Sequence, residues 1–95
     1  MASLEEKHNL KETCHKALSS KNDYLFKDLC SLAERAGFVF RSQRGSHLIY
    51  KHPSYFSEKS FNTLNLQPDK NNPSKAKPYQ VKQVVDFIRE AKPKK

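Results

Sequence analysis

The fold is decided by the stretch FVFRSQRGSHLIYK, residues 38–51. Residues 38–42 favour a β-strand, because aromatic and β-branched side chains pack well on a pleated surface. Gln43-Arg44-Gly45 are typical of a turn in which Gly45 supplies the unusual φ. Residues 46–51 then predict the second strand of a hairpin, and Pro53 ends the pairing because proline cannot donate to a ladder.

Two helices are predicted before this hairpin. Over residues 4–18 the apolar side chains repeat at helical spacing along one narrow face. A polar break follows at residues 19–23, and a wider apolar stripe predicts a second helix over residues 25–36. Gly37 then supplies a C′ residue that can take a left-handed conformation, so the second helix is expected to end there.

A third strand and a third helix are predicted after the hairpin. Residues 52–60 are expected to form a connection, and residues 61–67 alternate strictly, with Leu64 and Leu66 on one face. Residues 68–77 predict a loop. The last helix is expected to start near Pro78, because valine and isoleucine recur at helical spacing from residue 81 to residue 88, and Pro93 closes it.

The element order is therefore α-α-β-β-β-α within a single domain of residues 1–95. The stripes on the helices are narrow enough to be buried against one face of the sheet. We therefore predict an α+β two-layer sandwich, with a three-stranded antiparallel sheet and helices on one face. Residues 1–24 form an N-terminal helical extension of this domain, and residues 92–95 form a basic tail.

The charge distribution indicates a polyanionic partner. The formal net charge is +8, and residues 75–95 carry seven basic and two acidic residues, which is +5 of that total. A basic excess of this kind favours nucleic acid, although a merely soluble basic protein is the alternative. Two cysteines, Cys14 and Cys30, are too few for a metal or disulfide framework, and no cofactor is expected. The sequence contains neither a membrane-spanning run nor a signal peptide, so we expect a cytoplasmic protein.

Strand alternation identifies the candidate functional residue. If Leu48 and Tyr50 face the core, His47 lies on the open face of the sheet with Lys51, Asn65, Gln67 and either Arg41 or Arg44. An imidazole among cations is suited to proton transfer beside a phosphodiester. The alternative is a hydrogen-bonded strand histidine without a chemical role, and a one-residue error in register would reverse the whole assignment. We interpret His52 as a strand-end residue, and His8 and His15 as surface residues.

Two motifs carry a resemblance to a known family. The first is Phe26-x-x-Leu29-Cys30-x-Leu32-x-x-x-Ala36-Gly37-Phe38, followed by Arg44-Gly45-Ser46-His47-x-x-Tyr50-x-His52-Pro53. The second comprises Leu64-Asn65-Leu66-Gln67-Pro68-Asp69 and Lys75-Ala76-Lys77-Pro78-Tyr79-Gln80-Val81. Over residues 25–91 the chain resembles the HicA family of bacterial toxins, in a longer-form branch. Asp69 stands where many short members have a histidine.

The resemblance implies a fold similar to a double-stranded-RNA-binding domain, RNase activity on messenger RNA with His47 as the catalytic residue, and a HicB-type antitoxin as partner. We therefore expect a metal-independent endoribonuclease, in which Arg44 and Lys51 stabilise charge on the phosphate and Ser46 donates a hydrogen bond to it. The other expected nucleic-acid-binding residues are Arg41, Gly45, Lys75 and Lys77.

Two alternatives remain open. A non-catalytic nucleic-acid-binding module would use Lys75, Lys77, Lys82 and Arg89 to follow the phosphate backbone. A degenerate toxin would keep only the binding of its antitoxin, with the basic face attracting an acidic protein.

Overall fold

The computed structural model describes residues 4–20, 23–57 and 62–93, without the side chains of residues 4–9 and 93. Along the chain the described elements are α1 (Leu4–Ser19), α2 (Phe26–Arg35), β1 (Val39–Arg44), β2 (His47–Lys51), β3 (Tyr55–Phe56), β4 (Thr63–Leu66), α3 (Pro78–Glu90) and β5 (Lys92–Pro93). The predicted order of three helices and three main strands is confirmed. The third strand is shorter than expected, and Phe61, its predicted first residue, lies outside the described residues.

The main sheet is antiparallel with strand order β1-β2-β4, so β2 is the central strand. Tyr50 of β2 pairs with Phe40 on one side and with Leu64 on the other. The register between β1 and β2 shifts between Phe40 and Ser42, which makes Arg41 the extra residue of a bulge. The three-stranded antiparallel sheet of the α+β prediction is therefore confirmed.

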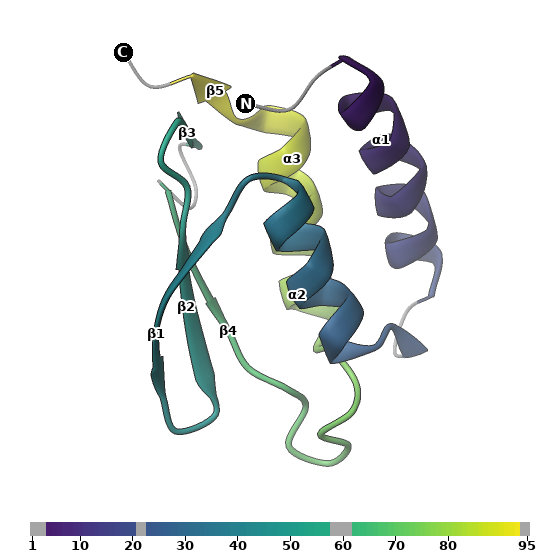
Figure 1. Cartoon of the computed structure of the whole chain (residues 1–95). Coiled ribbons are helices and arrows are strands. Elements are labelled where there is room, and N and C mark those ends of the chain that lie inside the picture. Colours follow the sequence, from purple (N-terminus) through teal and green to yellow (C-terminus); the bar gives the residue numbers. More distant parts are fainter. Residues whose placement is uncertain (1–3, 21–22, 58–61, 94–95) are drawn as a thin grey trace.

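All three helices lie on one face of this sheet, as predicted (Figure 1). Helices α2 and α3 lie next to the sheet, and α1 packs against both of them on the side away from the strands (Figure 1). Among the described elements, no helix covers the other face of the sheet (Figure 1). A residue whose side chain leaves β2 on that face is therefore available to a ligand.

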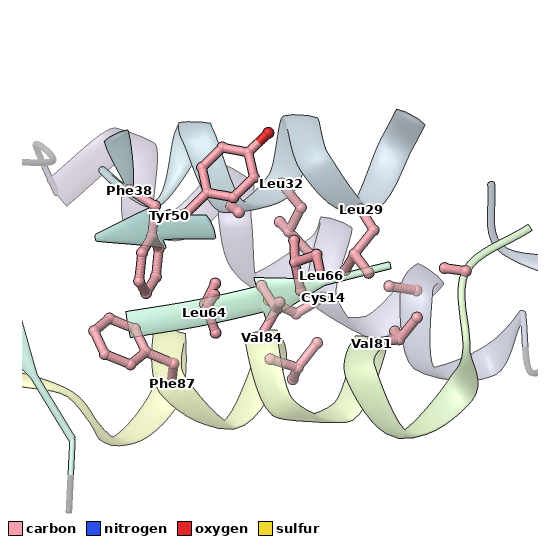
Figure 2. Packing of buried hydrophobic residues seen from close by; sticks show 14 of the residues in the cluster. Cys14, Leu29, Leu32, Phe38, Tyr50, Leu64, Leu66, Val81, Val84 and Phe87 are labelled. Atoms are coloured by element: carbon pink, nitrogen blue, oxygen red, sulfur yellow. The ribbon is translucent and has the colours of Figure 1, made fainter. Parts of the chain in front are cut away.

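The core forms where α2 and α3 meet β4. The side chains of Leu64 and Leu66 are fully buried, and they point between the two helices (Figure 2). Leu29 and Leu32 meet them from α2, and Val84 and Val85 from α3. The alternation predicted for the third strand is thereby confirmed, since Asn65, between the two leucines, is exposed.

A second, two-stranded sheet was not predicted. Tyr55 and Phe56 of β3 pair antiparallel with Pro93 and Lys92 of β5. Residues 55–56 and 92–93 therefore form strands, where a connection and a basic tail were predicted. Such short strands have too little hydrophobic alternation to be recognised, because a two-residue pairing depends on distant chain ends meeting.

Candidate active site on the open sheet face

A tight hairpin brings the candidate residues together. Arg44 and His47 are paired across the two strands, and only Gly45 and Ser46 connect them. Gly45 has φ +58°, in the left-handed region that a two-residue hairpin requires. The side-chain amide of Gln43 donates from Nε2 to the Gly45 carbonyl at 2.9 Å. The turn is one residue later than predicted, and it places the Arg44 side chain directly opposite that of His47.

His47 lies on the open face of the sheet. Tyr50 is only 3% exposed on the helix side, and Leu48 packs against the core from the same side. Because successive side chains of a strand point to opposite faces, His47, Ile49 and Lys51 share the uncovered face. The ring of His47 is half-buried rather than sealed in the interior. The register required by the sequence argument is therefore the one the chain adopts.

The imidazole of His47 is held through one nitrogen. Its Nδ1 lies 2.9 Å from Oδ1 of Asn65, which is on β4. Because Oδ1 can only accept, Nδ1 is the protonated donor and Nε2 carries a lone pair. Within the described part of the chain, no hydrogen bond engages Nε2. The arrangement holds the ring through one nitrogen and leaves the other nitrogen without a hydrogen bond in the described residues, which is what transfer of a proton to or from a ligand needs.

Only some of the predicted cations lie beside this ring. Arg44 is the cross-strand neighbour of His47, with Cβ atoms about 5 Å apart for such a pair. Lys51 is exposed on the same face but stands four residues further along β2, which is about 13 Å. Arg41 occupies the bulge of β1 and is also exposed. A phosphate at His47 would therefore meet Arg44 first, and Lys51 would meet a neighbouring phosphate.

Lys75 and Lys77 lie in the connection between β4 and α3. Nζ of Lys75 is 3.4 Å from the Asp23 carbonyl and 3.9 Å from its Oδ1, beside a bridge between Leu25 and Lys75. Nζ of Lys77 stands 5.9 Å from the centre of the Tyr79 ring. Neither lysine has a hydrogen bond to His47 within the described ranges. Lys75 thus ties this connection to the start of α2.

The second histidine of the hairpin region is a structural residue. His52 is 5% exposed; its Nε2 donates to the Ala36 carbonyl at 2.8 Å, and its Nδ1 accepts from the backbone N–H groups of Ser54 and Tyr55 at 3.1 and 3.0 Å. Its ring also stacks on Phe87 at 5.7 Å. Burial lowers the pKa of His52, so the neutral ring is favoured. His52 follows the strand end as expected, but its burial was not foreseen.

Gly37 makes room for that buried ring. Its φ is +103°, and a Cβ added there would lie 2.5 Å from Nε2 of His52. The N–H of Gly37 donates to the Glu34 carbonyl and that of Phe38 to the Ala33 carbonyl, both at 3.0 Å, which is a Schellman motif. The predicted C′ role of Gly37 is confirmed. The contact with His52 is an additional reason for glycine there.

A buried amide supports the strand that holds Asn65. Gln80, in the first turn of α3, is 3% exposed. Its Oε1 accepts from the Gln67 N–H at 3.1 Å, and its Nε2 donates to the Asn65 carbonyl at 3.2 Å. Sequence reasoning placed Asn65 on the open face but did not identify it as the partner of His47, and it missed Gln80. The only signal for Gln80 was an amide on the apolar side of a helix.

Two further searches apply to the described residues alone. In residues 4–20, 23–57 and 62–93, no three His, Cys, Asp or Glu side chains gather as a metal ion would need. None of the helices described there is both long and apolar enough to cross a bilayer.

Comparison with known proteins adds one finding. A family model described as the HicA toxin of bacterial toxin-antitoxin matches residues 26–92 of the 95-residue chain. The match covers α2, the whole main sheet and α3, and it includes His47, Asn65 and Gln80. Neither the curated proteins nor the solved structures show a significant match to the chain.

Proposed function

The chain belongs to the HicA family, the toxin component of bacterial toxin–antitoxin systems, and from this premise we propose that it is an endoribonuclease that cleaves messenger RNA. His47 is the catalytic residue and acts as a general acid/base. The reaction needs no metal, because RNA carries its own nucleophile, the 2′-hydroxyl. The cytoplasm, where messenger RNA is translated, is the compartment of action.

The observation that carries this proposal is the environment of one ring. His47 shares the uncovered face of the sheet with Ile49 and Lys51, its Nδ1 is bonded to Asn65 at 2.9 Å, and no hydrogen bond within the described residues engages its Nε2. Arg44 faces it from the adjacent strand. A base beside a guanidinium is suited to RNA cleavage, because the 2′-hydroxyl loses a proton in the same step in which the phosphate gains negative charge.

The proposed step is an internal transfer at phosphorus. Nε2 of His47 takes the proton of the 2′-hydroxyl while the 2′-oxygen forms a bond to phosphorus. The bond between phosphorus and the 5′-oxygen breaks, a water molecule gives a proton to that oxygen, and the imidazolium returns its proton to the hydroxide that remains. The products are a 2′,3′-cyclic phosphate and a 5′-hydroxyl. One positioned base contributes roughly 10²–10⁴ in rate, which suits a slow enzyme without a second proton-transfer residue.

The basic residues divide into two groups in this proposal. Arg44 stabilises the charge that develops on the phosphate, and Ser46 donates a hydrogen bond to it from the turn, where Gly45 lets the backbone approach. Lys51 and Arg41 contact neighbouring phosphates. Lys75 and Lys77 extend the binding surface along the connection before α3. The element order α-β-β-β-α of residues 26–90 is consistent with a fold like that of double-stranded-RNA-binding domains.

The proposal is tested with purified protein and a labelled messenger RNA in the presence of EDTA. His47→Ala is expected to lose cleavage by roughly 10²-fold or more while keeping the wild-type melting temperature. His15→Ala, an exposed histidine of α1, is the matched control and keeps full activity. Cyclic phosphate ends on the products support the transfer step. Undiminished cleavage by His47→Ala would refute the assignment.

A non-catalytic RNA-binding module is the competing candidate, because the open face is basic whether or not it cleaves. Both candidates require RNA binding that weakens with salt. For single strands, the logarithm of the binding constant falls by about 0.7 per phosphate contact for each tenfold rise in salt concentration. Shortened RNA distinguishes the enzyme from the binder. A protein with intact RNA affinity that leaves every substrate at full length would establish the second candidate.

The family assignment also implies an antitoxin partner. We propose that it is of the HicB type, and that it covers the open face and so keeps RNA from His47. Co-expression with the adjacent gene product should yield a complex in which His47 and Arg44 are protected from solvent exchange.

A further inference from the structure

We propose that Asn65 and Gln80 form a positioning pair, in which Gln80 fixes the edge of β4 and Asn65 uses that fixed edge to hold the His47 imidazole in one tautomer. This inference rests on the proposed role of His47. It gives helix α3 a part in the reaction, although α3 lies on the covered face of the sheet.

The argument starts at the outer edge of β4. The inner edge of β4 pairs with β2, and the other edge of a terminal strand leaves backbone groups without a strand partner. Those groups include the Asn65 carbonyl and the Gln67 N–H, and Gln80 bonds to both, at 3.2 and 3.1 Å. A primary amide offers one carbonyl and one N–H₂, so Gln80 acts as the peptide group that a fourth strand would have provided.

The second step connects this edge to the catalytic ring. Leu66, between the two bonded residues, is fully buried, so residues 65–67 are held from both the helix side and the edge. The backbone of Asn65 is therefore fixed, and its side chain emerges on the open face with Oδ1 2.9 Å from Nδ1 of His47. Asn65 pairs with Ile49, so the contact with His47 is a diagonal one across the strands.

The third step is chemical. In the neutral ring, a carbonyl oxygen at Nδ1 requires the proton on that nitrogen and leaves Nε2 unprotonated. A histidine side chain free in water favours the opposite tautomer, with the proton on Nε2. The bond to Asn65 therefore selects the form that can accept a proton from a ligand on the open face. The charged residue paired with His47 is Arg44 on β1, and Lys51 stands about 13 Å further along β2; neither of them can accept a hydrogen bond from Nδ1.

The first experiment measures the tautomer without any activity. Nitrogen-15 spectra of histidine-labelled protein, with the His47 signals identified by their loss in His47→Gln, should show Nδ1 protonated and Nε2 bare at neutral pH. Asn65→Ala and Gln80→Met should both move His47 towards the free-imidazole pattern. Thr63→Ala, on the same face of β4, and Gln83→Met, one turn further along α3, are the matched controls and should leave the signals unchanged.

The second experiment measures cleavage by the same variants. Asn65→Ala and Gln80→Met are expected to lower kcat about 10- to 100-fold, the usual effect of a mispositioned group. Asn65→Asp keeps an oxygen acceptor and adds a negative charge that stabilises the imidazolium. It should therefore retain activity, with the acidic limb of its pH–rate profile moved to higher pH. A merely structural Asn65 would not move that limb.

The outcomes separate this inference from the proposed function. Unchanged His47 tautomer and unchanged cleavage in Asn65→Ala would overturn the positioning pair, even if Gln80→Met proved too unstable to study. Inactive Asn65→Asp would also overturn it, because the amide would then have to donate to Nδ1 rather than accept. Failure of the proposed function looks different: His47→Ala would cleave like the wild type, whatever the spectra show.

Discussion

His47 begins the central strand β2 and His52 follows its end, and their separation of five positions puts the two imidazoles on opposite faces. The ring of His47 has one nitrogen bonded and one outward, beside Arg44. The ring of His52 is buried, with both nitrogens bonded to backbone groups and with aromatic neighbours. Histidine is thus a candidate catalytic residue at position 47 and a structural residue at position 52. The alternation of side chains along the strand decides which role each one has.

The His52 ring joins three separate parts of the chain. His52 bonds the carbonyl at the end of α2 and two N–H groups at the start of β3, and its ring lies against Phe87 of α3. The carbonyl of Ala36 belongs to the last turn of α2, where no helical partner remains for it. Removing the ring would leave these polar groups without hydrogen-bond partners and would also create a cavity.

The largest expected effect in this comparison is that of His52→Ala on stability. We expect it to lower the free energy of unfolding by about 3 kcal/mol or more, since it adds a cavity to unsatisfied buried hydrogen-bonding groups. His47→Ala should change the same quantity by less than about 0.5 kcal/mol, since its half-buried ring makes a single side-chain hydrogen bond, to the exposed Asn65. Urea unfolding of both variants measures the difference. Equal destabilisation by the two substitutions would contradict the distinction between a catalytic His47 and a structural His52.

Gly37→Ala should damage the buried region nearly as much. A Cβ 2.5 Å from His52 Nε2, on a backbone with φ +103°, combines overpacking with backbone strain, for about 2–4 kcal/mol in total. Thermal unfolding measures the loss. The double variant Gly37→Ala/His52→Ala should lose less than the sum of the two, because the clash disappears with the ring. Strict additivity would show that the contact is irrelevant.

The pH dependence of stability tests whether the His52 ring is buried in its neutral form. Burial lowers the pKa of His52 in the folded state, so the unfolded chain binds its proton more readily. This residue's contribution is therefore present above the unfolded pKa, about 6.5, and is lost as pH falls below it, with a slope of at most about 1.4 kcal/mol per pH unit for one proton.

The measurement is urea unfolding of the wild type and of His52→Gln between pH 8 and pH 5. The variant is less stable throughout, but its curve should lack the part of the slope that His52 causes. An identical slope in both proteins would mean that His52 is not the titrating group.

Much of this organisation follows from local pattern. The stripes of α2 and α3, the glycine at position 37 and the alternation of Leu64 and Leu66 each specify an element without reference to the others. The face of His47 followed from Leu48 and Tyr50, because burial of one side of a strand fixes its parity. These features were predicted because each depends on residues close together in the chain.

The remainder depends on contacts between distant segments. The bond from Asn65 to His47 requires the offset between β2 and β4, and Gln80 finds β4 only after α3 has docked. The pairing of β3 with β5 joins residues 55–56 to 92–93. The burial of His52 likewise depends on α3, through Phe87. Periodicity contains no information on such offsets, so the supporting residues of both histidines were missed.

The smallest effect belongs to the second glycine and tests whether backbone or packing matters. Gly45→Ala meets no atom within 4 Å, and its φ of +58° is one that asparagine tolerates. We therefore expect about 1 kcal/mol of destabilisation from Gly45→Ala and less from Gly45→Asn, both measured by urea unfolding. Gly37 should accept neither residue, because there the obstacle is the His52 ring. If Gly45→Ala lowered the free energy of unfolding as much as Gly37→Ala does, the positive φ alone would explain both glycines. The close contact between residue 37 and the His52 ring would then not be needed to explain the glycine at the end of α2.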